Sequence, residues 1–141
     1  MKLEQQVCSL ELSKRLKELG FEQESLFYWY GARKFNLIMN SEIRDILWDE
    51  RCFENLTETA ELKERFSAYT VAELGEMLPE TIDQNDDDSP YFLNIHKEKD
   101  NDLWQIRYGN SEDEHCIYIL EKTEADARAK MLIYLKENNL L

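Results

Sequence analysis

The chain has 141 residues, 43% of them hydrophobic, and its 17 basic and 30 acidic residues give a formal net charge of −13. This length and this hydrophobic content predict one domain, residues 1–141, with a core of its own, and they exclude a disordered acidic chain. The acidic excess argues against binding to nucleic acid, because nucleic-acid-binding proteins neutralise phosphates with Lys and Arg.

The sequence also disfavours a membrane-spanning protein and a secreted protein. The longest apolar runs, Leu26–Tyr30 and Met131–Leu135, are much shorter than a membrane span. The cysteines, Cys8, Cys52 and Cys116, are odd in number and form no CxxC pair, and the first residues contain no apolar stretch of the signal-peptide type. We therefore expect a cytoplasmic protein with free thiols and no membrane contact.

The first predicted element is a helix over SLELSKRLKELG. Ser9 is its expected N-cap and Gly20 its expected end. Leu12, Leu16 and Leu19 recur at the helical period and indicate one apolar face.

The next elements are predicted to be mainly strands. The aromatic run Ser25–Tyr30 indicates a strand, and Phe35–Met39 is expected to pair with it as a hairpin. Ser41 is a possible N-cap of a further helix with Ile43, Ile46 and Leu47, and residues 60–66 also look helical.

A capping box of Thr70 and Glu73 predicts a short helix over VAELGEML that stops before Pro79. Residues 81–90, TIDQNDDDSP, are expected to form a loop.

Three strand patterns follow, at residues 91–97, 103–109 and 115–120, and the connections between them are short and polar. This spacing favours an antiparallel meander.

The last predicted element is a helix opened by Thr123 and Asp126, with ion pairs Glu124–Arg128 and Asp126–Lys130 on its wet side. Three alanines at alternate positions let this helix approach the sheet closely. The residues expected to face the sheet are Ala125, Ala129, Met131, Leu132, Ile133 and Leu135. Trp104, Ile106, Ile117 and Leu132 are expected in one core.

The predicted fold class is therefore α+β. An antiparallel β-sheet, built from the three-strand meander and a possible N-terminal hairpin, is flanked by helices near both termini.

One stretch resembles the start of a calcium-binding loop. Asp83, Asn85 and Asp87 occupy the first alternate ligand positions, but Asp88 stands where the sharp turn needs glycine and Asn94 where a bidentate Glu is required. We therefore expect no metal site here.

The imidazole and thiol groups of the meander, on His96, His115 and Cys116, do not form an expected catalytic pair. His115 and Cys116 are neighbours and point to opposite faces of a strand, and His96 lies two strands from Cys116. The four glycines form no phosphate-binding loop, so no cofactor is expected. An enzyme with an unrecognised carboxylate site stays an alternative.

Two stretches, CSLELSKRLKELG and YTVAELGEMLP, look like the first helix of a helix-turn-helix, but neither is followed by a recognition helix. A nucleic-acid-binding domain with a divergent winged helix nevertheless stays open as a second alternative. The aromatic strand residues are expected to be mainly core, since stacking platforms for single strands lie in basic grooves. These residues are Tyr28, Trp29, Tyr30, Tyr91, Phe92, Trp104, Tyr108 and Tyr118.

Residues 73–114 hold 3 basic and 13 acidic residues, and so carry most of the charge excess. In a meander, the loop before the first strand and the loop between the second and third strands lie at the same end of the sheet. We therefore hypothesise an acidic patch that binds a basic protein partner. It comprises Asp83, Asp86, Asp87, Asp88, Glu112, Asp113 and Glu114. A solvated surface that aids solubility is the simpler alternative.

Three segments, VCSLELSKRLKELGFEQESLFYW, YTVAELGEMLP and TEADARAKMLIYLKENNLL, together resemble a group of uncharacterised small proteins of bacteriophages, prophages and integrative elements of bacteria. The resemblance leaves out residues 31–66 and the acidic loop. It implies an accessory protein of a mobile element inside the bacterial cytoplasm, without an assigned activity or catalytic residues. The function predicted from the sequence is therefore a non-enzymatic, acidic interaction protein.

Overall fold

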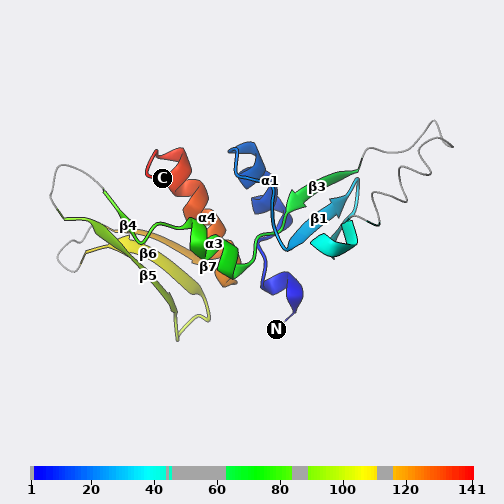
Figure 1. The fold of residues 1–141 in the computed structure, drawn as a ribbon. Coiled ribbons are helices and arrows are strands. Elements are labelled where there is room, and N and C mark those ends of the chain that lie inside the picture. Colours follow the sequence, from blue (N-terminus) through cyan, green and yellow to red (C-terminus); the bar gives the residue numbers. More distant parts are fainter. Residues whose placement is uncertain (1, 44, 46–62, 84–88, 111–115) are drawn as a thin grey trace.

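The computed structural model describes residues 2–43, 45, 63–83, 89–110 and 116–141. The fold is α+β, as predicted, but the strands form two antiparallel sheets and not the single sheet that was expected (Figure 1). The described elements are η1 (Leu3–Gln5), α1 (Leu10–Glu18), β1 (Phe27–Gly31), β2 (Phe35–Met39), β3 (Glu64–Ser67), α3 (Val71–Met77), β4 (Thr81–Ile82), β5 (Tyr91–Lys97), β6 (Trp104–Gly109), β7 (Ile117–Glu121) and α4 (Glu124–Glu137).

The first sheet has three strands in the order β2-β1-β3. The predicted hairpin is confirmed, because β1 pairs antiparallel with β2 and Trp29 lies opposite Leu37. At the tight turn of this hairpin, a Cβ on Gly31 would collide with the carbonyl oxygen of Lys34, so only glycine fits there.

The prediction of a helix at residues 60–66 is wrong for its last three residues, because Glu64–Ser67 forms strand β3. Its Phe66 lies opposite Trp29 of β1, far away in the sequence, and no local pattern signals such a pairing. Residues 40–43 are helical, as expected, but the helix already includes Asn40, so Ser41 is not its N-cap. Ile46, Leu47 and residues 60–62 lie outside the described part of the chain.

The second sheet has four strands in the order β4-β5-β6-β7. The predicted meander is confirmed as β5, β6 and β7, with Ile95, Ile106 and Ile119 side by side across it. Residues 81–90 are not entirely a loop, since Thr81–Ile82 pairs with the start of β5 as a fourth, short strand.

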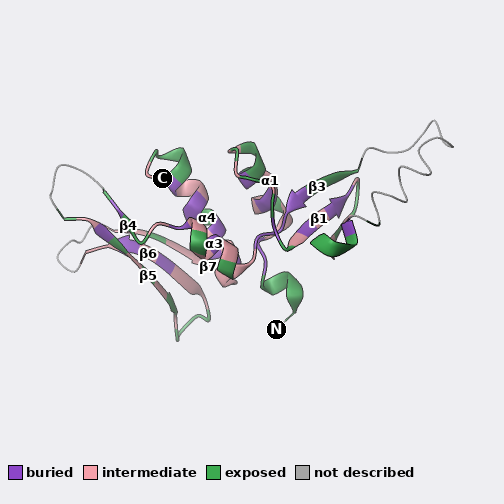
Figure 2. Cartoon of the chain, in the orientation of Figure 1, coloured by how far each residue is buried: buried purple, intermediate pink, exposed green. Residues whose placement is uncertain are grey.

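Helix α4 packs on this second sheet along β6 and β7. Its alanines at 125, 127 and 129 are fully buried, as are Leu132 and Ile106, and Figure 2 shows buried residues along α4 and β6. The core that was predicted around Trp104, Ile106, Ile117 and Leu132 is confirmed as one cluster, in which Trp104 and Ile117 are only partly buried.

The polar contacts of α4 differ from the prediction. The carboxylate of Asp126 does not pair with Lys130. It accepts a hydrogen bond of 2.7 Å from the backbone N–H of Ser9, while Lys130 pairs with Glu121. The Glu124–Arg128 pair forms as predicted. Its side chains are only 20% and 16% exposed, so the pair does not lie on the solvent-exposed side of the helix. Asp126 thereby connects the start of α1 to the start of α4.

Short helix α3 begins with the predicted capping box of Thr70 and Glu73. The Glu73 carboxylate also accepts hydrogen bonds from the Ser25 hydroxyl at 3.1 Å and from the Leu26 backbone N–H at 2.9 Å. One side chain therefore caps α3 and fixes the chain just before β1.

None of the helices in the described part of the chain is both long and apolar enough to cross a membrane.

Candidate functional site

The face of the second sheet opposite α4 is open to solvent. Strand register arranges its side chains in rows, with Asn94, Arg107 and Tyr118 in the central row. We call this surface the open face, and its described residues are Thr81, Phe92, Asn94, His96, Gln105, Arg107, Gly109, Cys116, Tyr118 and Leu120.

Two aromatic side chains of the open face are unusually exposed. Phe92 is 57% and Tyr118 is 55% exposed, so the expectation that both lie in the core is wrong. Successive residues of a strand point to opposite faces, and α4 covers only one face of this sheet. The expectation holds for the buried aromatics Tyr28, Tyr30, Tyr91 and Tyr108, while Trp29 and Trp104 are partly buried.

Arg107 lies at the centre of the open face, between Asn94 and Tyr118. Its guanidinium folds over Gly109, with Nε 3.1 Å and Nη2 3.3 Å from the place where a Cβ of that residue would be. Among the described residues, Arg107 has no hydrogen-bond or ion-pair partner. It forms one wall of a shallow recess of about 450 Å³ that is lined by Phe92, Leu93, Asn94, Arg107, Gly109 and Asn110.

The charge of the open face differs from the charge of the whole chain. Where the structure describes this face, it contains no Asp or Glu, and Arg107 is its one formal charge, in a protein of net charge −13. On the covered side, by contrast, Glu121 of β7 is paired with Lys130 of α4.

Of the seven residues of the hypothesised acidic patch, the structure describes only Asp83, which is exposed directly after β4. Asp86, Asp87, Asp88, Glu112, Asp113 and Glu114 lie outside the described residues. The register places the end of β4, the start of β5, the end of β6 and the start of β7 at the same end of the sheet. The strand ends thus meet as expected, and the patch itself stays a prediction.

Cys8 is not suited to nucleophilic chemistry. Its thiol is fully buried 3.2 Å from the Ser13 hydroxyl, and burial raises the pKa of this thiol to about 11. A thiol with such a pKa stays protonated at neutral pH, whereas the thiolate is the reactive form.

The other candidates for chemistry do not come together in the described residues. His96 lies on β5, and strand β6 separates it from β7 and the free, partly buried Cys116. Cys52 and His115 lie outside the described residues. Within the described ranges, no group of three His, Cys, Asp or Glu side chains is placed to hold a metal ion.

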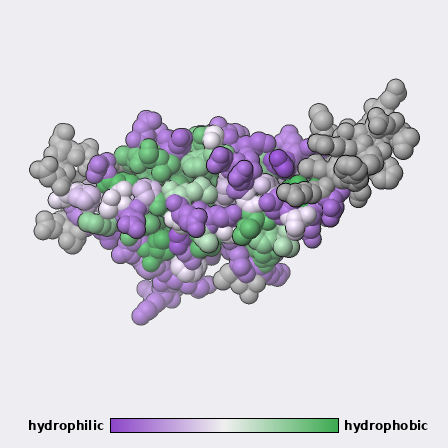
Figure 3. All heavy atoms as spheres, in the orientation of Figure 1, coloured by the Kyte–Doolittle hydropathy of each residue, from purple (hydrophilic) through white to green (hydrophobic). Residues whose placement is uncertain are grey.

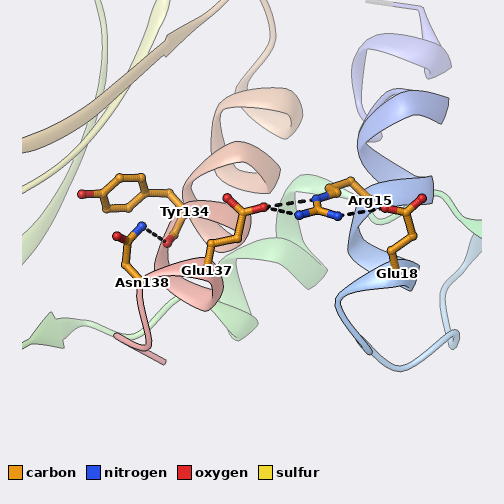
Figure 4. A network of polar contacts seen from close by, with 5 residues as sticks. All are labelled: Arg15, Glu18, Tyr134, Glu137 and Asn138. Atoms are coloured by element: carbon orange, nitrogen blue, oxygen red, sulfur yellow. Dashed lines mark hydrogen bonds and ion pairs between the residues drawn. The ribbon is translucent and has the colours of Figure 1, made fainter.

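A second surface feature is a groove of about 540 Å³ between α1 and α4, with Leu12, Ile119, Ile133 and Tyr134 among its apolar lining residues. Figure 3 shows hydrophobic residues gathered on the surface over the position of α4. Arg15 bridges the two helices here: its Nη2 is 2.6 Å from Glu137 and its Nη1 is 2.9 Å from Glu18 (Figure 4). Glu11, Lys14 and Lys130 add further charged side chains to the lining of this groove.

Neither helix that looked like the first half of a helix-turn-helix has a helix directly after it. In the described chain, α1 is followed by β1 and α3 by β4. Comparisons with family models, with curated proteins and with solved structures find no significant match to this chain. The surface itself is therefore the basis for any functional proposal.

Proposed function

We propose that this protein is non-enzymatic and acts by binding a partner protein through the open face. The observation that carries the proposal is the exposure of Phe92 and Tyr118 on either side of Arg107. Exposed aromatic surface of this kind is costly in water, and a partner that covers it recovers that free energy.

The residue types of the open face fit a protein interface. Aromatic residues and Arg dominate the binding energy of such interfaces, and charged residues are depleted from their centres and enriched at their rims. Phe92, Tyr118 and Arg107 form the centre of the open face. The acidic residue Asp83 lies at the rim, because it directly follows the edge strand β4.

The charge of the chain favours a partner with a basic rim. The net charge of −13 speeds encounters with basic proteins and slows encounters with acidic ones, an effect that weakens as salt is added. The resemblance to proteins of phages and mobile elements supports a role as an accessory protein of such an element, with a bacterial or phage protein as the partner.

A second candidate function is binding of single-stranded nucleic acid. Aromatic rings and Arg on the open face of an antiparallel sheet are also used to stack bases. The open face, however, supplies a single Arg in a chain of net charge −13, which disfavours a phosphate backbone.

The test compares partners captured from phage-infected and uninfected bacterial cells by tagged protein. The Phe92→Ser/Tyr118→Ser variant is expected to lose the specific partner. The matched control is Leu26→Ser, because Leu26 is 61% exposed but lies outside the open face. Undiminished capture by the double variant would refute the proposal, and recovery of nucleic acid in place of protein would support the second candidate.

A further inference from the structure

We propose that the recess beside Gly109 receives one carboxylate of the partner protein, which pairs with Arg107, while Phe92 and Tyr118 pack against the apolar atoms around it. The occupant is a peptide segment with a single Asp or Glu between apolar and basic residues. This inference rests on the proposed function, since it defines the chemistry of the partner at the same surface.

Arg107 carries a positive charge at the centre of the open face. This guanidinium has no partner among the described residues, and none of the described residues of the open face carries a carboxylate. A partner that covers Phe92 and Tyr118 also removes Arg107 from water, and an unpaired charge at an interface is strongly destabilising. The partner must therefore supply the acceptor, and a carboxylate binds a guanidinium through two parallel hydrogen bonds.

Gly109 determines the space that is available to the guanidinium of Arg107. Because Gly109 has no side chain, the guanidinium of Arg107 lies over it, at the wall of the recess that Phe92 also lines. A Cβ at this position would lie 3.1 Å from Nε of Arg107 and 3.1 Å from Cβ of Cys116, so an alanine would narrow the recess and press on Arg107. Glycine thus leaves room for the guanidinium of Arg107 at the wall of the recess, where a carboxylate of the partner can reach it.

The charge of the chain also limits the composition of the rest of the partner segment. One Arg binds one carboxylate. A segment with many carboxylates would be repelled by the net charge of −13 of this chain. Charge complementarity therefore selects a basic segment with one acidic residue. A nucleic acid, whose every residue carries a phosphate, fits this arrangement less well.

The test uses three probes on the full chain. The first is a peptide pool, acetyl-Lys-Xaa-Asp-Xaa-Lys-amide, in which Xaa is Phe, Tyr, Leu or Val. The second pool carries Asn in place of Asp, and the third probe is single-stranded oligothymidylate. Titrations are followed by the NMR amide signals of β5 and β6. We expect the Asp pool to bind at least about tenfold more tightly than the Asn pool.

Variants then assign this difference to the recess. Arg107→Gln is expected to bind both pools equally, Arg107→Lys to retain part of the preference, and Gly109→Ala to weaken binding of the Asp pool several-fold. Thermal unfolding of each variant checks that it folds. Leu26→Ser, at an exposed position outside the open face, is the control and is expected to keep the preference for Asp.

Equal affinity of the wild-type protein for both pools would overturn the carboxylate site, and so would an absence of binding at millimolar peptide. Neither result refutes the proposed function, which depends on the separate capture experiment with Phe92→Ser/Tyr118→Ser. Tighter binding of oligothymidylate than of the Asp pool, lost in Arg107→Gln, would assign the recess to nucleic acid and overturn the inference.

Discussion

The two sheets of this protein differ in how their aromatic residues are exposed. In the three-stranded sheet, Tyr28 and Tyr30 are 4% and 9% exposed on one face of β1, and on the other face Trp29 donates a hydrogen bond to the Cys8 carbonyl oxygen. In the four-stranded sheet, α4 covers one face, and Phe92 and Tyr118 stay exposed on the other. Aromatic residues of the first sheet therefore stabilise the fold, and those of the open face are available for binding.

The largest expected effect tests this contrast directly. Tyr28→Ala is expected to lower the free energy of unfolding by about 3–5 kcal/mol, because it removes a buried aromatic ring. Its hydroxyl also donates to the Gln23 carbonyl oxygen at 3.2 Å. Tyr118→Ala, on the open face, is expected to change the free energy of unfolding by less than about 1 kcal/mol. Urea denaturation measures both values, and similar costs for the two variants would show that the sheets do not differ as described.

The next effect concerns the covered face of the four-stranded sheet. Leu132 is fully buried in α4, so Leu132→Ala is expected to cost about 2–5 kcal/mol of unfolding free energy. The matched control is Lys136→Ala, at an exposed position one turn further along the same helix. A loss no greater than that of the control would mean that α4 does not pack on the sheet in solution.

A smaller effect is expected at the connection between the two sheets. Glu73→Ala removes the acceptor for Thr70, Ser25 and Leu26, and is expected to cost about 1–3 kcal/mol, since several donors lose their partner. Glu76→Ala is the control, because Glu76 is exposed on the same helix. Equal stability of the two variants in thermal unfolding would show that the bonds of Glu73 contribute little.

The smallest effect is a dependence of stability on alkaline pH. Burial raises the pKa of the Cys8 thiol from 9.0 to about 11 and that of the Tyr108 hydroxyl from 10.0 to about 12. The unfolded chain therefore releases these protons at lower pH than the folded chain does. The stabilisation is complete below pH 9 and is lost as the pH rises through 9 to 12.

Urea unfolding at pH 8, 9, 10 and 10.5 measures this decline. Cys8→Ala removes one of the two groups, and its stability is expected to fall less steeply with pH than that of the wild-type protein. Parallel curves for the two proteins would contradict a raised pKa for Cys8.

The fold was predicted best where neighbouring segments pair with each other. The strand at Tyr91–Lys97 was placed with its observed bounds, and α3 and α4 begin at the capping residues Thr70 and Thr123. Caps, short polar connections and apolar periodicity act over a few residues, so a single sequence contains this information. Strand β3 was missed because its partner, β1, lies more than thirty residues away.

The open face was only partly predictable. In YFLNIHK, Phe92, Asn94 and His96 alternate with Leu93 and Ile95, and this alternation already indicates that one side of the strand is more polar. The interpretation of all the strand aromatics as core overrode that signal. The unpaired position of Arg107 beside Gly109 could not be predicted, because it depends on which residues stand opposite each other across three strands.

The sequence by itself determined the α+β class, the helix caps, the meander and the charge, since these follow from local propensity and composition. Only the tertiary structure decided that the strands form two sheets and not one. The same packing decided that Asp126 bonds Ser9 instead of Lys130. These features depend on contacts between residues far apart in the chain, which form only when burial of apolar surface brings those residues together.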